Sequence, residues 1–193
     1  MCFISTSTRS GPRWSMTSEW RFVQMTKRFK PPIFATTKRG STVWSLNIGE
    51  QERLLLARLL DELRGLLTSD DDPDTPVSPV LQRLFPVAYH DDVEKEAEYQ
   101  RLMREELVAS RLFQIDAVAG YLGLDDKQTL KEGQVIALMQ SINAVRVVLG
   151  TLLDVGEDDE IGGVDDDEDL EAERQLYGFL SWLLEWTVRS LQT

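Results

Sequence analysis

The sequence has few of the residues that build covalent crosslinks, metal centres and catalytic sites. It contains one cysteine, Cys2, and one histidine, His90, among 193 residues. A single cysteine excludes an intrachain disulfide and a cysteine-rich metal site, and this usage suits a reducing cytosol. We therefore expect neither a metal nor another cofactor.

Signatures of common enzyme classes are also missing. The chain has no glycine-rich phosphate loop, no His-Glu-x-x-His and no Gly-x-Ser-x-Gly. His90 is followed by Asp91 and Asp92, but sequence neighbours rarely face one another as a base and its orienting group, and no nucleophile accompanies them. We predict a loop histidine and a protein that is not an enzyme.

Long hydrophobic runs are absent as well. No segment approaches the roughly 20 apolar residues needed to span a bilayer, and residues 1–15 lack the apolar core of a signal peptide. The expected location is the cytoplasm, with no membrane partner.

Negative charge is abundant but unevenly placed. The net charge is −12, yet residues 1–40 hold eight Lys or Arg and one acid, a local balance of +7 that leaves −19 for the rest. The acidic part of the chain, residues 41–193, should repel phosphate backbones, which argues against direct, sequence-specific DNA binding. The natural complement is a protein partner with a basic surface.

Periodicity divides the chain into an arm and one domain. Residues 1–27 show no apolar period and are predicted to be a disordered basic arm, whereas residues 28–193 are predicted to be a single helical domain. Residues 33–37 and 42–46 are β-rich and flank a turn in which Gly40 can adopt a positive φ. They predict a hairpin, with Pro31 and Pro32 limiting its first strand to an edge role.

Helical periodicity dominates after the hairpin. Helices are expected over residues 49–68 and 92–122, after a capping box formed by Thr129 and Glu132, and from near Asp169 to the end, with a short helical turn over residues 78–85. The first helix would carry a stripe formed by Leu56, Leu60, Leu63 and Leu67. The apolar surface of the second helix would comprise Tyr99, Leu102, Met103, Leu107, Leu112, Phe113, Ile115 and Val118. The fold class predicted is mainly α, a small bundle of four to five helices with a short N-terminal β-hairpin.

An acidic loop is expected at residues 154–173, which hold twelve carboxylates and no base. Calcium binding is one interpretation, but the spacing fails the EF-hand pattern, since Gly162 stands at the fifth position of a loop that starts with Asp158 as its first. A solvated loop is favoured. Its candidate role is contact with a basic partner, through the run Asp165, Asp166, Asp167, Glu168 and Asp169.

Two further features are candidates for structural or interface roles. Arg146 stands among apolar residues after Asn143, so its charge must be paired or reach the surface; a buried bond to Glu105, Glu106 or Asp116 is the favoured interpretation, and an interface the other. Trp182 and Trp186 lie one turn apart on the last helix and are expected to complete the core rather than bind a ligand.

Several segments together resemble a known family. They are Leu81-Gln-Arg-Leu-Phe-Pro-Val-Ala-Tyr-His-Asp-Asp92, residues 98–112, Asn143-Ala-Val-Arg-Val-Val-Leu-Gly150 with its acidic sequel, and Leu176-Tyr-Gly-Phe-Leu-Ser-Trp182. The chain resembles, over residues 39–191, the actinobacterial family that includes the oxidative-stress transcriptional regulator AosR, many members of which have no assigned function.

The resemblance implies a non-enzymatic cytoplasmic regulator of stress-response transcription, working with a sigma factor or RNA polymerase rather than reading DNA alone. Redox sensing in the characterised branch uses a pair of nearby cysteines, and this chain has only Cys2, so that route is closed here. Members also lie beside genes for Clp protease adaptors. The alternative is therefore an interaction or scaffold protein linked to Clp-type proteolysis.

Overall fold

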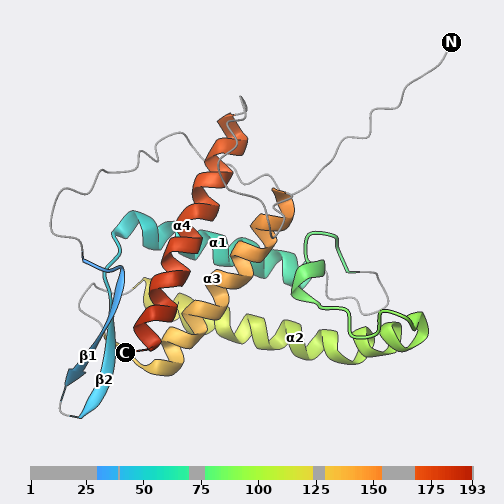
Figure 1. The fold of residues 1–193 in the computed structure, drawn as a ribbon, viewed down its shortest axis with the longest axis horizontal. Helices are drawn as coiled ribbons and strands as arrows, with labels where there is room; N and C mark the ends of the chain where they lie inside the picture. Colours follow the sequence, from blue (N-terminus) through green and yellow to red (C-terminus); the bar gives the residue numbers. More distant parts are fainter. Residues whose placement is uncertain (1–29, 39, 70–76, 124–128, 154–167, 193) are drawn as a thin grey trace.

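The chain folds into the expected helical bundle with a hairpin at its N-terminal side (Figure 1). The computed structural model describes residues 30–38, 40–69, 77–123, 129–153 and 168–192. In order, the elements are β1 (Ile33–Lys38), β2 (Ser41–Leu46), α1 (Glu50–Ser69), the short 3-10 helix η1 (Gln82–Leu84), α2 (Val93–Leu122), β3 (Thr129–Leu130), α3 (Glu132–Leu152) and α4 (Glu168–Leu191). The predicted fold class is confirmed; the predicted disordered arm, residues 1–27, lies outside the described residues.

The hairpin forms where β propensity predicted it. β1 and β2 pair antiparallel, with Ile33 opposite Leu46, and Gly40 takes a φ of 80° at the turn. The hairpin is joined to the bundle because the indole N–H of Trp44 donates a 3.0 Å hydrogen bond to the carbonyl of Ser190, near the end of α4.

The sequence did not reveal β3, which extends the sheet to three strands in the order β1-β2-β3. Its two residues, Thr129 and Leu130, pair with Ser45 and Trp44 of β2. The predicted capping box of Thr129 and Glu132 is wrong, since Thr129 is occupied in the sheet. The cap residue of α3 is Lys131, whose backbone N–H donates to Oε1 of Gln134 at 2.9 Å. Long-range strand pairing has displaced the local cap.

The core is centred on α3, which contacts α1, α2, α4, β2 and η1. Its buried side chains include Leu138, Ile142 and Leu149, and α1 supplies the predicted stripe of Leu56, Leu60, Leu63 and Leu67. In the described part of the chain, α3 alone is long and apolar enough to cross a membrane, although the sequence was expected to hold no such segment. More than half of it is buried inside this bundle, as in the core helix of a soluble protein.

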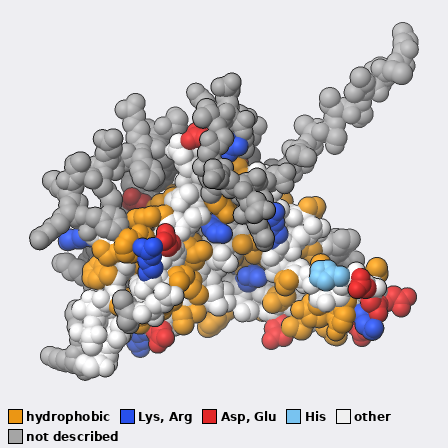
Figure 2. Space-filling model, in the orientation of Figure 1, with side chains coloured by type: hydrophobic (Ala, Val, Ile, Leu, Met, Phe, Trp, Pro, Cys, Tyr) orange, Lys and Arg blue, Asp and Glu red, His pale blue; other side chains and the backbone are white. Residues whose placement is uncertain are grey.

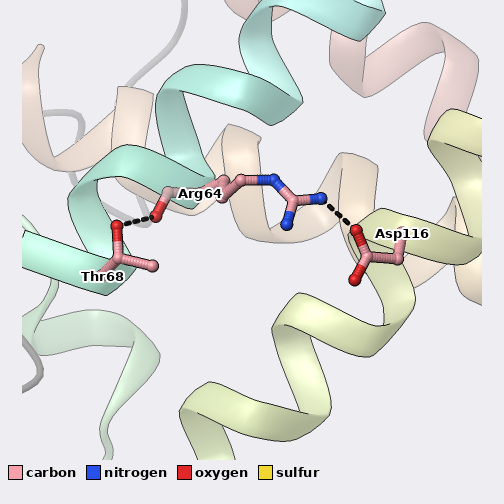
Figure 3. Close-up of polar contacts among 3 residues, drawn as sticks. All are labelled: Arg64, Thr68 and Asp116. Carbon is pink, nitrogen blue, oxygen red and sulfur yellow. Dashed lines mark hydrogen bonds and ion pairs between the residues drawn. The ribbon is translucent and has the colours of Figure 1, made fainter.

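A polar contact links α1 to α2 at the edge of this core. The guanidinium of Arg64 forms an ion pair with the carboxylate of Asp116, while the Thr68 hydroxyl donates to the carbonyl of Arg64 one turn along α1 (Figure 3). Asp116 is largely exposed. The contact therefore lies at the surface, where ion pairs contribute little free energy.

α2 is the helix that departs most from its expected role. All of its buried residues lie at or after Arg104, and its first part, residues 93–103, projects beyond the crossing of α3 and α4 (Figure 1). Leu102 and Phe113, expected on the apolar face of this helix, are 64% and 75% exposed. The expectation is wrong for these two residues, because the buried face of α2 lies on its other side, along Val108, Ile115 and Val118. For Ile115 and Val118, which were expected on the apolar surface, it is confirmed.

Candidate functional site

Arg146 is a partly buried side chain of α3 at its contact with α4. The carbon at the centre of its guanidinium lies 5.2 Å from the centre of the Tyr177 ring, on α4. Its Nε is buried and has no hydrogen-bond partner. A guanidinium over an aromatic face is attracted by the negative face of the ring, so the charge is stabilised here by stacking.

The expected carboxylate partner of Arg146 is replaced by this ring. Asp116 pairs instead with Arg64, and Glu105 and Glu106 are exposed on α2. The expectation of a buried ion pair, which would have cost about 3–5 kcal/mol to break, is therefore wrong. For loss of a stacked guanidinium in Arg146→Ala we expect about 0.5–2 kcal/mol.

A glycine allows this ring to sit so close to α3. Gly150 is one turn after Arg146, and a Cβ built on it would lie 3.1 Å from Cε2 of Tyr177. Such a distance is tighter than ordinary carbon contacts, so any larger residue would push the ring away. Asn143, one turn before Arg146, is exposed.

The tryptophan pair lies at the margin of the core. Trp182 and Trp186 are partly buried and pack against the core cluster. The Trp182 ring centre is 6.1 Å from that of Phe179, and the Arg189 guanidinium lies 5.4 Å from the centre of the Trp186 ring. This agrees with their predicted part in packing.

The acidic segment is shorter than the sequence suggested. α4 begins at Glu168, so the predicted loop over residues 154–173 is corrected at its C-terminal end, and Glu168 and Asp169 belong to the first turn of a helix. This start agrees with the last helix expected from near Asp169. Asp165, Asp166 and Asp167 lie outside the described residues.

Sequence reasoning missed a surface on α2. We define the α2 outer surface by the exposed apolar residues Val87, Tyr89, Leu102 and Phe113 and the exposed carboxylates Glu98, Glu105 and Glu106. Figure 2 shows hydrophobic and acidic side chains side by side at the projecting end of this helix. The missed signal was the spacing, because Leu102 and Phe113 are eleven residues apart and so fall on one line of the helix, opposite the buried residues.

The loop that carries Val87 and Tyr89 is held against α2 by side chains of the helix. Oε2 of Glu96 accepts hydrogen bonds from the backbone N–H groups of Ala88 and Tyr89, at 2.9 and 2.8 Å, and Nε2 of Gln100 donates to the carbonyl of Pro86. Nε2 of Gln100 also donates to Oε1 of Glu96 at 2.6 Å, and this bond, followed by those from the backbone, holds the pKa of Glu96 below its usual range. The loop and the helix thus present one connected surface.

His90 lies exposed in this same loop. Within the described ranges, no group of three or more His, Cys, Asp or Glu side chains is placed to hold a metal ion. The groups that this region presents to solvent are apolar side chains and carboxylates.

Comparison with known proteins assigns the chain to a family. A family model described as a domain of unknown function (DUF2017) matches residues 27–191. Nothing matches among the curated proteins, and nothing matches among the solved structures. With most of its length matched, the chain belongs to this family of proteins with a domain of unknown function, DUF2017.

Proposed function

We propose that this protein is a non-enzymatic cytoplasmic regulator of stress-response transcription that acts through protein contacts, with a sigma factor or RNA polymerase as its partner. The observation that carries the proposal is the presence of large apolar side chains exposed between carboxylates, above all Leu102 and Phe113 on α2. Contiguous apolar surface with a polar rim is typical of sites that bind proteins.

The identity of the partner comes from the resemblance to the family that includes AosR. The charge is consistent with it, since −19 outside residues 1–40 opposes contact with DNA and favours basic protein surfaces. The acidic run that includes Asp165, Asp166 and Asp167 would add long-range attraction. Binding to a basic partner should then weaken as salt rises, because ions screen exposed charges.

The second candidate is an interaction or scaffold protein of Clp-type proteolysis. The same surface supports it, because a basic adaptor would be recognised by the same apolar and acidic side chains. The two candidates differ in their partner and not in the chemistry of the contact.

Affinity capture with the full-length chain, followed by direct binding to the purified partner, tests the proposal. A sigma factor or polymerase subunits that bind the pure chain support it, whereas direct binding of Clp components alone supports the second candidate. Tight binding to promoter DNA without a protein would overturn the proposal, as would a reversible peroxide response that survives Cys2→Ser.

The role of the acidic run in partner binding is tested by replacing residues 165–169 with serine. Weaker capture by this variant, with less dependence on salt, assigns the run to the interface. Equal capture by both chains removes the run from the interface and leaves the helical surfaces.

A further inference from the structure

We infer that the α2 outer surface is the docking site for a basic amphipathic helix of the partner protein. The inference rests on the proposed function and deepens it, because it names the surface that is used and the chemistry of what binds there. Four observations lead to it.

The first is where the exposed apolar side chains gather. Of the eight large hydrophobic residues exposed in the described part of the chain, four belong to the α2 outer surface, with Val87 and Tyr89 in the loop and Leu102 and Phe113 on the helix. Single exposed hydrophobic residues are ordinary, but four of them gathered on one helix and the loop fastened to it mark an interaction surface.

The second observation is that these side chains are continuous. The Tyr89 ring packs edge-on against Tyr99, with ring centres 6.1 Å apart. Leu102 follows Tyr99 by three residues, so the two are neighbours on the helix surface. From Leu102 the line runs through the exposed Ala109 to Phe113, over about 16 Å at ~1.5 Å per residue. A row of this length matches three turns of a partner helix lying along α2.

The third observation is that the projecting part of α2 is ordered without help from the core. No side chain of residues 93–103 is buried, yet Asp92 caps the helix by accepting from the N–H of Lys95 at 3.1 Å. Glu96 and Gln100 fasten the preceding loop as described above. The surface is therefore already in place, and binding does not require this segment to fold first.

The fourth observation is charge, which selects the occupant. Between residues 86 and 113 the exposed charges are five carboxylates, Asp91, Glu94, Glu98, Glu105 and Glu106, against two cations, Lys95 and Arg101. A second copy of the chain would bring like charges together, which disfavours it as the occupant. A helix with leucine-type residues on one face and flanking Lys or Arg complements both the apolar row and its rim.

The probe for a test is a labelled synthetic peptide of leucine and lysine, about four turns long, with its leucines on one helical face. Binding to the full-length chain is measured by fluorescence anisotropy. Two controls are a peptide of the same composition in shuffled order and a counterpart with glutamate in place of lysine. Tight binding of the lysine peptide alone is expected, and equal binding of the glutamate peptide would overturn the inference.

Variants then locate the contact. Leu102→Ser combined with Phe113→Ser should lower the affinity for the lysine peptide at least about tenfold, a change of ~1.4 kcal/mol in binding free energy. A triple variant should also bind the peptide less tightly, and its affinity should depend less on salt; the changes are Glu98→Gln, Glu105→Gln and Glu106→Gln. The matched control is Leu54→Ser on α1, since Leu54 is as exposed as Leu102, and it should bind as the parent does.

Unchanged affinity of the double variant would overturn the inference. The inference would also be overturned if light scattering showed the parent chain as a dimer and the double variant as a monomer, because the occupant would then be a second copy. All substituted positions are exposed, so circular dichroism should show each variant folded.

The same variants separate this inference from the proposed function. If the double variant still binds sigma factor or polymerase as the parent does, the function stands and the surface assignment fails. If neither protein binds the parent, while the peptide does and the double variant does not, the surface stands and the transcriptional role fails.

Discussion

α3 and the projecting part of α2 are both regular helix, but they stand at opposite extremes of burial. α3 buries ten of its 21 residues, whereas α2 buries six of 30 and none before Arg104. Both contain leucines and other large apolar residues. A helix therefore does not need buried side chains along its whole length, because the projecting segment is held by a cap and by the loop that packs onto it.

Truncating one leucine in each helix tests the difference in burial most directly. Leu138→Ala on α3, where the side chain is 1% exposed, should cost about 2–5 kcal/mol of unfolding free energy because it leaves a cavity. Leu102→Ala should change stability by no more than about 0.5 kcal/mol. Urea unfolding of both variants measures this. Similar costs would mean that Leu102 packs against the body of the protein.

Glycine substitutions in α1 and α3 compare an open position with one that is packed against a neighbouring ring. Gly65→Ala in α1, where nothing lies within 4 Å of the added carbon, should stabilise the protein by about 0.5–1 kcal/mol because alanine favours helix. Gly150→Ala should instead cost about 1–3 kcal/mol by displacing Tyr177 from beneath Arg146. Thermal melts compare the two, and a stabilising Gly150→Ala would show that the ring can move freely.

The Arg64–Asp116 pair measures how firmly α2 is tied to α1. Because both side chains are substantially exposed, the interaction energy should be below about 1 kcal/mol. A double-mutant cycle of Arg64→Ala and Asp116→Ala isolates this energy from other effects of each change. A value of several kcal/mol would make the pair a main support of α2 and not a surface contact.

Acid should loosen the loop on the projecting part of α2 before it unfolds the bundle. The pKa of Glu96 is lowered by the hydrogen bonds that it accepts, so its contribution is present above the ordinary glutamate value of about 4.3. That contribution is lost as the pH falls through the lower folded value. The amide NMR shifts of Ala88 and Tyr89 should titrate together, and Glu96→Gln should abolish the titration. Flat shifts over this range would contradict the assigned contact.

Local patterns predicted the elements that local forces control. The hairpin around Gly40 and α1 with its leucine stripe formed as expected, since turn chemistry and apolar period are written in adjacent residues. The candidate site was less accessible. Asn143, Arg146 and the tryptophans were identified from the sequence, but Leu102 and Phe113 were placed in the core.

The failures share one physical cause, which is competition from distant residues. Thr129 pairs with β2 instead of capping α3, and Arg146 lies over Tyr177 instead of meeting a carboxylate. In each case the sequence correctly stated a need, for a cap or for a partner to a charge. Which group met that need depended on what the fold brought near.

The sequence by itself determined the helical class, the hairpin, the acidic body and the lack of a cysteine pair, because composition and short-range periodicity require no knowledge of neighbours. The tertiary structure alone decided which side of α2 is buried and that Thr129 joins the sheet. An amphipathic pattern offers a helix more than one apolar line, and only packing against α1 and α3 selects the line that is buried and leaves Leu102 and Phe113 in solvent.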